Sequence, residues 1–200
     1  FEAAKAHLAA MLSVLDIFRI GIGPSSSHTV GPMRIARTFV RALAKSGKLD
    51  RTARVTVELQ GSLALTGVGH GTLDASILGL IGFAPDTTCP DDAAAALKRV
   101  REDRRLVLGG KREIAFDPAA DIDLAGHIIP DLHPNGMKLA AFDAAGERLS
   151  QRTYYSTGGG FVASEAQLQR KPKDDRINTG TRVPHDFGSA EELLAACAQT

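Results

Sequence analysis

Apolar positions three and four residues apart predict helices in three parts of the chain. The first helix starts at Pro32, has arginines and a lysine on its other side, and ends at Gly47. The second covers Thr72–Leu80, and the third opens at Pro90 with two aspartates, which suit the positive end of a helix. The apolar face of the first helix consists of Ile35, Ala36, Phe39, Val40 and Leu43.

Alternating apolar positions predict strands between and after these helices. Val55, Val57 and Leu59 alternate with polar residues, which is the period of a half-buried strand. Further strands are predicted at REIAF, MKLAAF and RLSQRTYYST, the last two joined by a hairpin turn at residues 143–146. Helices and strands do not alternate regularly, and a hairpin requires antiparallel pairing, so the pattern predicts an α+β fold with a mainly antiparallel sheet.

The two ends of the chain are patterned differently from its middle. Residues 1–10 predict a short helical lead-in before Met11, which is a candidate native start, and residues 11–162 carry the regular pattern of one domain. Residues 163–188 contain many helix breakers and predict a loop or linker. Ser189 and Glu192 form a capping box before a last helix that has no Gly or Pro stop, which predicts excision from a longer polypeptide.

Composition narrows the class of protein. The chain has 200 residues, of which 44% are hydrophobic and 24% charged, as expected for one globular domain. A net charge of +1 and aromatic residues at only 5% disfavour a nucleic-acid partner. The sequence shows no signal peptide and no apolar run near about 18 residues, so we expect a cytoplasmic protein without a membrane segment. Cys89 and Cys197 do not form a metal-ligand pair.

Hydroxyl groups and an imidazole crowd a segment just before the first helix that is predicted to be a loop. Ser25, Ser26, Ser27 and Thr29 surround His28 there. Free backbone N–H groups at a helix start favour an anion, and the hydroxyls add donors that orient a carboxylate or phosphate. The alternative is that one serine caps the helix while the others are solvated.

A second candidate is the glycine-rich segment Gly67–Thr72, which leaves His70 flanked by residues with little bulk. A ligand could approach such an imidazole closely, and a neutral imidazole is a suitable general base near neutral pH. The alternative is a flexible turn from strand to helix with an incidental exposed histidine.

Two further turns are candidates. In the first, an Asn-Gly turn presents His133, Asn135 and Lys138 as a donor, an amide and a cation for a carboxylate ligand, although turn formation alone also explains it. In the second, Ser156–Gly160 ends a strand with unhindered backbone N–H groups, which suits either an anion nest or a hinge.

Four segments in this order resemble the β domain of the bacterial iron–sulfur L-serine dehydratases: SVLDIFRIGIGPSSSHTVGPMRIA, GSLALTGVGHGTLDASILGLIG, HPNGMKLAAFD and YYSTGGGFV. The resemblance runs from about Ser13 to Val162. It implies an L-serine ammonia-lyase that eliminates water from L-serine to give pyruvate and ammonia, in amino-acid degradation and gluconeogenesis.

The same resemblance implies a [4Fe–4S] cluster in place of pyridoxal phosphate. In this family, cysteines of an α domain or a separate α subunit hold the cluster, and Cys89 and Cys197 do not match those ligands. The chain is therefore expected to carry no metal ligand, to be inactive alone, and to need the cluster-bearing α domain or subunit. A homodimer is the expected oligomer because symmetric dimers are the commonest state.

By resemblance, the polar segments supply the site that closes over the cluster. His70 is the first candidate for the base that removes the Cα proton, followed by His28 and His133. The expected substrate-binding residues are Ser25, Ser26, Ser27, Thr29, Asn135, Lys138, Gly158 and Gly159.

The family's β domain is also similar to the allosteric substrate-binding domain of phosphoglycerate dehydrogenases, which has an α+β fold. This similarity leaves open a second function, a regulatory domain that binds serine or another small anion. A structural dimerisation module is a third alternative, but it leaves the clustered histidines and hydroxyls unexplained.

Overall fold

The computed structural model describes residues 21–169, 187 and 189–198 of the chain. They belong to two units, one spanning Ile20–Arg170 and the other made of residues 1–19 and 171–200. In the second unit the described element is helix α8 (Ala190–Cys197), where the Glu192 N–H donates to Ser189 Oγ at 3.1 Å. This contact confirms the predicted cap, whereas the predicted lead-in at residues 1–10 lies outside the described residues.

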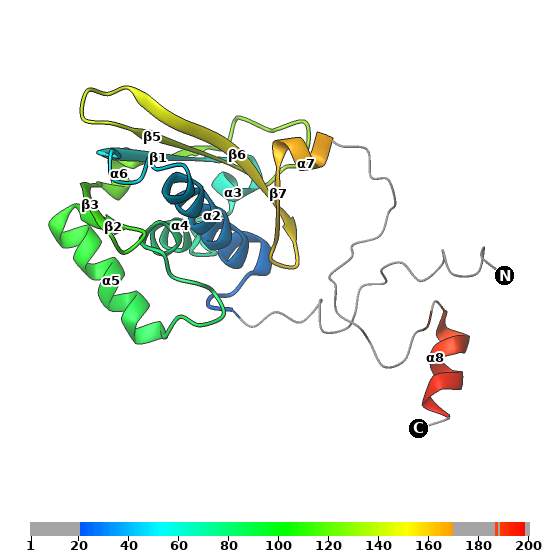
Figure 1. Cartoon of the computed structure of the whole chain (residues 1–200). Coiled ribbons are helices and arrows are strands. Elements are labelled where there is room, and N and C mark those ends of the chain that lie inside the picture. Colours follow the sequence, from blue (N-terminus) through cyan, green and yellow to red (C-terminus); the bar gives the residue numbers. More distant parts are fainter. Residues whose placement is uncertain (1–20, 170–186, 188, 199–200) are drawn as a thin grey trace. The chain divides into compact units, whose positions relative to one another are not determined.

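A five-stranded mixed sheet forms the centre of the larger unit (Figure 1). Strand β1 pairs in parallel with the edge strand β4, and the other three pairings are antiparallel. In spatial order the strands are β4 (Ile122–Ala125), β1 (Arg54–Gln60), β5 (Gly136–Phe142), β6 (Arg148–Gly158) and β7 (Phe161–Ser164). The predicted α+β fold with a mainly antiparallel sheet is confirmed.

The hairpin predicted at residues 143–146 joins β5 to β6. The Asp143 N–H donates to the Glu147 carbonyl at 3.0 Å, and the Gly146 N–H donates to the Asp143 carbonyl at 3.0 Å. Gly146 has a φ of +83°, a conformation that glycine adopts without a steric penalty. The turn chemistry seen in the sequence therefore fixes the register of the two strands.

Helix α2 (Gly31–Lys45) covers one face of the sheet, and α4 (Thr72–Ile81) packs against α2 (Figure 1). The apolar stripe of α2 is buried, with Ile35 and Phe39 both fully inaccessible. The helix ends at the predicted point, since Gly47 has a φ of +69° and cannot continue it. Burial of this stripe against β5 and β6 forms the core of the domain.

A smaller layer lies beyond α4 (Figure 1). Helix α5 (Pro90–Asp103) leads into the two-stranded sheet of β2 (Arg105–Leu108) and β3 (Arg112–Ala115). Strand β3 is the predicted REIAF strand. Strand β2 was not predicted because it has only four residues and directly follows a charged helix end.

Two expectations need correction. The hydroxyl-rich segment is not a loop, because Ser26–Val30 forms a π-helical turn, η2. Residues 163–188 do not begin as a loop either: β7 runs to Ser164 and is followed by helix α7 (Glu165–Gln169). There the Ser164 N–H donates to Gln167 Oε1 at 2.8 Å and the Gln167 N–H donates to Ser164 Oγ at 3.3 Å, so Ser164 and Gln167 form a capping box.

Two other short helices complete the domain, α3 (Ser62–Leu65) and α6 (Pro118–Asp121). Among the helices formed by the described residues, none has the length and apolarity needed to cross a membrane.

Candidate functional site

The hydroxyl-rich segment folds as one hydrogen-bonded turn. Ser25 is its N-cap, and its Oγ accepts a hydrogen bond from the His28 N–H at 3.1 Å. The Thr29 and Val30 N–H groups both donate to the Ser25 carbonyl, at 3.0 and 3.1 Å. Helix α2 follows without a break, so the turn is held by a buried helix. π-helical turns are rare and occur frequently at functional sites.

Reciprocal hydrogen bonds join this turn to the second histidine segment. Thr29 Oγ1 donates to the His70 carbonyl at 2.8 Å, and Thr72 Oγ1 donates to the His28 carbonyl at 2.6 Å. Both threonines are buried, Thr72 completely. A buried hydroxyl that satisfies a buried carbonyl is costly to remove, so these bonds fix the backbone of both histidines.

The imidazole of His28 has a hydroxyl partner on each side. Its Nδ1 lies 2.8 Å from Ser27 Oγ, and its Nε2 lies 3.1 Å from Ser62 Oγ. A neutral imidazole has one donor and one acceptor nitrogen, and a hydroxyl serves either role. Both ring nitrogens of His28 are therefore occupied within the protein.

His70 differs, because one of its ring nitrogens is open. Its Nδ1 lies 2.8 Å from the Thr66 carbonyl, which only accepts, so Nδ1 carries the proton and donates. In the neutral ring, Nε2 then holds the free lone pair. Within residues 21–169, Nε2 has no hydrogen-bond partner, which makes it the available proton acceptor of the site.

The two imidazoles lie close together, with ring centroids 5.0 Å apart and planes inclined at 40°. Burial lowers the pKa of His28 below its ordinary value of 6.5, and the neighbouring charge of His70 lowers it further. His28 therefore stays neutral at a lower pH than an exposed histidine, which avoids a second positive charge beside His70.

The Asn-Gly turn also reaches this cluster. The Pro134 carbonyl accepts a hydrogen bond from the Ser62 N–H at 3.0 Å, and Asn135 Nδ2 donates to the Ser156 carbonyl at 3.0 Å. Ser156 is completely buried, and its Oγ donates to the Ser27 carbonyl at 2.7 Å. Segments far apart in the sequence thus meet around the serine turn.

In the neutral ring of His133, the proton lies on the other nitrogen than in His70. Its Nδ1 accepts a hydrogen bond from the Asn135 N–H at 3.1 Å, so the proton of the neutral ring lies on Nε2. Burial lowers the pKa of His133 below its ordinary value of 6.5, which favours that neutral form. Across the described part of the chain, His133 makes no hydrogen bond to His28 or His70.

Two glycines permit the close approach of these segments. A Cβ at Gly31 would overlap Ser156 Oγ, and a Cβ at Gly61 would overlap the Pro134 carbonyl oxygen. Gly61 also has a φ of +52°, which most residues avoid. Side chains at either position would push the serine turn or the Asn-Gly turn away from the histidines.

Lys138 already has a partner. Its Nζ lies 2.6 Å from Glu58 Oε2 on the neighbouring strand, and Gln60 Nε2 donates to Glu58 Oε1 at 2.6 Å. Burial alone would raise the pKa of Glu58, but the hydrogen bonds from Lys138 and Gln60 and the charge of Lys138 outweigh it and lower the pKa below its ordinary value. Glu58 thus neutralises the charge of Lys138, which was predicted from the sequence to bind a carboxylate ligand.

The glycine turn after Ser156 is engaged by another side chain. Gly158 and Gly159 have positive φ values of 96° and 56° in the connection from β6 to β7. The next residue, Gly160, accepts a hydrogen bond from Arg34 Nη1 at 3.0 Å. Among the described residues, Gly158 and Gly159 make no hydrogen bond with a histidine, and the structure links this turn to α2 instead.

The structure brings together most, but not all, of the site residues expected from the sequence. The joined group consists of Ser25, Ser27, His28, Thr29, His70 and Asn135. Ser26 lies in the same turn with an exposed side chain, and within the described residues that side chain has no hydrogen bond.

Two contributors, Ser62 and Thr66, lay outside every candidate segment of the sequence. Thr72 and Ser156 lay inside candidate segments but were given no individual role. Ser62 had a usable signal, because it comes directly after the end of a buried strand, where side chains from separate segments converge. Thr72 had none, since a threonine at a helix start is expected for capping alone.

A cluster or metal site is not formed by these residues. In the described part of the chain, no group of three or more His, Cys, Asp or Glu side chains is placed to hold a metal ion. Cys89 is exposed at the start of α5, and Cys197 is exposed in α8 of the other unit. Iron–sulfur clusters need several thiolates, so the described residues do not fit such a group.

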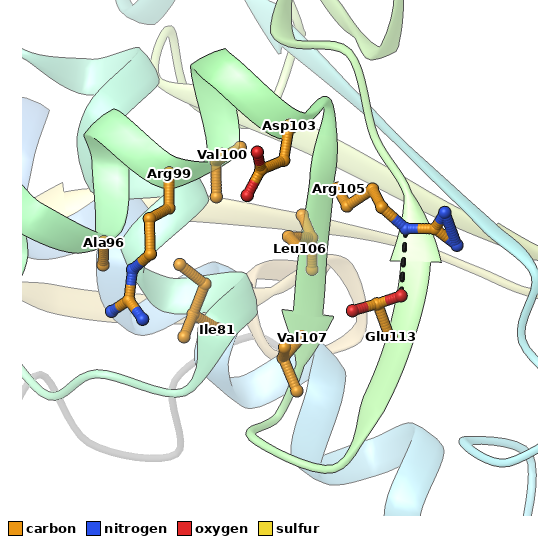
Figure 2. A pocket seen from close by; sticks show the side chains of 9 residues that line it. All are labelled: Ile81, Ala96, Arg99, Val100, Asp103, Arg105, Leu106, Val107 and Glu113. Atoms are coloured by element: carbon orange, nitrogen blue, oxygen red, sulfur yellow. Dashed lines mark hydrogen bonds and ion pairs between the residues drawn. The ribbon is translucent and has the colours of Figure 1, made fainter.

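A separate groove of about 490 Å³ lies between α5 and the small sheet (Figure 2). Its apolar lining includes Ile81, Val100, Leu106 and Val107. Its charged lining residues are Arg99, Asp103, Arg105 and Glu113, and among them Arg105 Nε lies 2.9 Å from Glu113 Oε1. The groove presents no imidazole or hydroxyl group. The chemistry is therefore concentrated around His28 and His70.

Comparison with known proteins identifies a family match for most of the chain. A family model described as "Serine dehydratase beta chain" matches residues 13–167, a range that contains every residue of the cluster. The L-serine dehydratase of Streptomyces coelicolor is 45% identical over 191 residues, which are 94% of this chain and 41% of that protein.

Relatives from Escherichia coli are similar over the same extent. L-serine dehydratase TdcG is 43% identical over 188 residues, covering 94% of this chain and 40% of that protein. L-serine dehydratase 1 is 41% identical over 191 residues, covering 95% and 40%. The chain thus spans about two fifths of the length of the curated relatives it matches.

Proposed function

The chain belongs to the serine dehydratase β-chain family, and we propose that it supplies one half of the active site of an L-serine ammonia-lyase. The other half comes from an α domain or α subunit. The observation that supports this role is the close pair of His28 and His70 imidazoles, in which three ring nitrogens bond to other residues and His70 Nε2 stays open.

The reaction sets clear chemical demands. Conversion of L-serine to pyruvate and ammonia removes the Cα proton and expels the β-hydroxyl as water. The Cα proton is weakly acidic, so a positioned base with a pKa near the working pH is required. The substrate carboxylate and ammonium must also be held in one orientation.

His70 is the proposed base. Its Nδ1–H bond to the Thr66 carbonyl directs the lone pair to Nε2, where a proton can be received. His28 is the proposed positioning residue, because its two ring nitrogens are occupied by Ser27 and Ser62. A neutral His28 makes protonation of His70 easier than a charged neighbour would.

The hydroxyl groups divide into two proposed roles. Ser25, Ser27 and Thr29 hold the histidines through the bonds described above, whereas Ser26 is free to donate to a substrate carboxylate. His133 presents an Nε2–H donor and is the proposed secondary acid or carboxylate ligand. Asn135 positions Ser156 through the hydrogen bond to its carbonyl. Lys138 would bind the substrate only if the substrate carboxylate replaced Glu58 as its partner.

Exposed apolar side chains occur in the segments that carry this polar half-site. Leu65, Val68 and Ile129 are 71%, 69% and 70% exposed. Leu65 lies next to Gly126, and the Ile128 carbonyl accepts a hydrogen bond from the Gly61 N–H just before α3, so the segment that carries Ile128 and Ile129 lies beside α3. We call these exposed side chains, together with Leu132, the apolar rim. Clustered exposed apolar residues mark protein interaction sites. The proposed occupant of the rim is the α domain or α subunit.

The [4Fe–4S] cluster of the proposed enzyme then has its cysteine ligands in that α domain or subunit. This assignment is supported by the sequence, which has two cysteines, Cys89 and Cys197, where a cluster needs several thiolates. The half-site of this chain contributes substrate binding, orientation and proton transfer.

The test replaces His70 by glutamine in the enzyme assembled with its α part. Pyruvate release from L-serine is expected to fall by about 10²–10⁴-fold in kcat, the typical contribution of a positioned base. The matched control is His127→Gln, because His127 is exposed and lies outside the cluster. Unchanged kcat in His70→Gln would show that His70 is not the base, and a rise in KM alone would indicate a binding role.

A further inference from the structure

A pocket of about 370 Å³ lies along the polar side of α2. Arg34, Arg37 and Arg41 are three and four residues apart, so they share one helix face. The pocket is closed by the loop after α4 and by the turn between β6 and β7. Its remaining lining residues are Thr38, Pro85, Asp86, Gly160, Phe161 and Val162.

The three arginines of this pocket are not neutralised by a carboxylate of the described residues, unlike five other arginines of the domain. Elsewhere, Arg51, Arg54, Arg101, Arg104 and Arg105 each pair with a carboxylate. Within residues 21–169, Arg34, Arg37 and Arg41 have no ion pair, and the one acidic residue in the lining is Asp86. Three arginines and one aspartate give the pocket a formal charge of +2.

Part of the pocket is organised in advance. Arg34 Nη1 donates to the Gly160 carbonyl at 3.0 Å, which ties the side chain to the β6–β7 turn. Like charges one helix turn apart destabilise a helix, so the unneutralised row costs stability unless an anion binds to it. Guanidinium groups match the geometry of phosphate oxygens and bind them through two parallel hydrogen bonds.

We propose that the Arg34–Arg37–Arg41 pocket binds a phosphate group as the dianion, either inorganic phosphate or the phosphomonoester of a small metabolite. A dianion balances the charge of the pocket, whereas a zwitterionic amino acid such as L-serine carries no net charge to offset it. The pocket is separate from the histidine half-site, so the proposal does not depend on the lyase function.

The experiment measures binding to this chain by isothermal titration calorimetry at constant ionic strength. One arm uses inorganic phosphate, a second uses glycerol 3-phosphate, and a third uses L-serine. The variant is Arg37→Gln/Arg41→Gln, which keeps the tethered Arg34. The matched control is Arg99→Gln on α5, an exposed arginine without an ion pair in the described residues (Figure 2).

The expected result is saturable binding of one phosphate group per chain, weakened at least about tenfold in the double variant and changed less than about twofold in the control. Tighter binding of glycerol 3-phosphate than of inorganic phosphate would identify a phosphomonoester as the ligand, and the reverse order would identify free phosphate. Hydrogen exchange should slow at Gly160–Val162 on binding.

Three results would overturn the proposal. They are no saturable phosphate binding, phosphate binding that survives in a folded double variant, and tighter binding of L-serine than of either phosphate at this pocket. Circular dichroism of the double variant checks that it is folded, and both substituted side chains lie outside the apolar stripe of α2.

Discussion

The histidine half-site and the α5–β2–β3 layer of the same domain are held together in different ways. In the layer, Leu106, Leu108 and Ile114 are almost completely buried, and the charged side chains of Arg105 and Glu113 are exposed and pair with each other. Around the histidines, the hydroxyls of the buried residues Thr29, Thr72 and Ser156 donate to backbone carbonyls of distant segments.

This difference indicates that the layer mainly stabilises the fold, whereas the half-site mainly holds side chains in a defined geometry. Burial of apolar side chains stabilises the folded state in proportion to the buried area, and this contribution does not depend on the direction of individual contacts. The layer is therefore stable without a precise arrangement of its exposed side chains. Hydrogen bonds between buried polar groups are directional, and each one contributes only modestly to the free energy of unfolding. Directional bonds are what the half-site requires to hold two imidazoles 5.0 Å apart.

The largest stability effect is expected in the layer. Leu108→Ala removes a completely buried side chain and leaves a cavity, so the free energy of unfolding should fall by about 2–5 kcal/mol. Val107→Ala on the same strand, where the side chain is 41% exposed, should cost about 1 kcal/mol or less. Urea denaturation of both variants measures the difference, and equal losses would contradict the burial argument.

A smaller stability effect is expected at Ser156. Ser156→Ala removes the hydroxyl that donates to the Ser27 carbonyl and leaves that carbonyl unsatisfied, at a cost of about 1–3 kcal/mol. Ser150→Ala on the same strand is the control and should change stability by less than about 0.5 kcal/mol. Unlike Leu108→Ala, Ser156→Ala should also speed hydrogen exchange in residues 25–30, and unchanged exchange there would show that the bond does not hold the serine turn.

The smallest expected effect is a pH dependence confined to the half-site. His28 and His133 have folded-state pKa values lowered below 6.5, chiefly by burial, so the unfolded chain binds protons first as the pH falls. Their contribution to stability is therefore complete above pH 6.5, decreases as the pH falls below that value, and levels off below the folded pKa.

Urea denaturation between about pH 8 and about pH 5 measures this dependence. His28→Gln should reduce the loss of stability on acidification, whereas His127→Gln should leave the loss unchanged. A steeper acid loss in His28→Gln would contradict the sign of the pKa change.

The regular elements were predictable from the sequence because their apolar spacing is long and consistent. The pattern in α2, with Phe39 at its centre, and the alternation through Val57 in β1 decide which face is buried. The short β2 and β4 were not predictable, since four residues do not define a period and β4 forms its parallel pairing with a distant strand.

The half-site was predictable only in part. The crowding of Ser27, His28 and Thr29 pointed to chemistry, but the contacts of Ser62 and Ser156 depend on how separate segments meet in space. The sequence presented Lys138 as a cation available to a ligand, but in the folded sheet it pairs with Glu58 on a neighbouring strand. Glu58 is distant in the sequence, so this pairing could not be predicted from the residues around Lys138. The pairing of a charge is a property of the folded sheet.

The most direct test of the half-site is serine-dependent pyruvate release, measured anaerobically with this chain alone and then with the cluster-loaded α part added. The account predicts no pyruvate from the chain alone and turnover after assembly. Pyruvate release by the chain alone, or none after an assembly with a verified cluster, would contradict it.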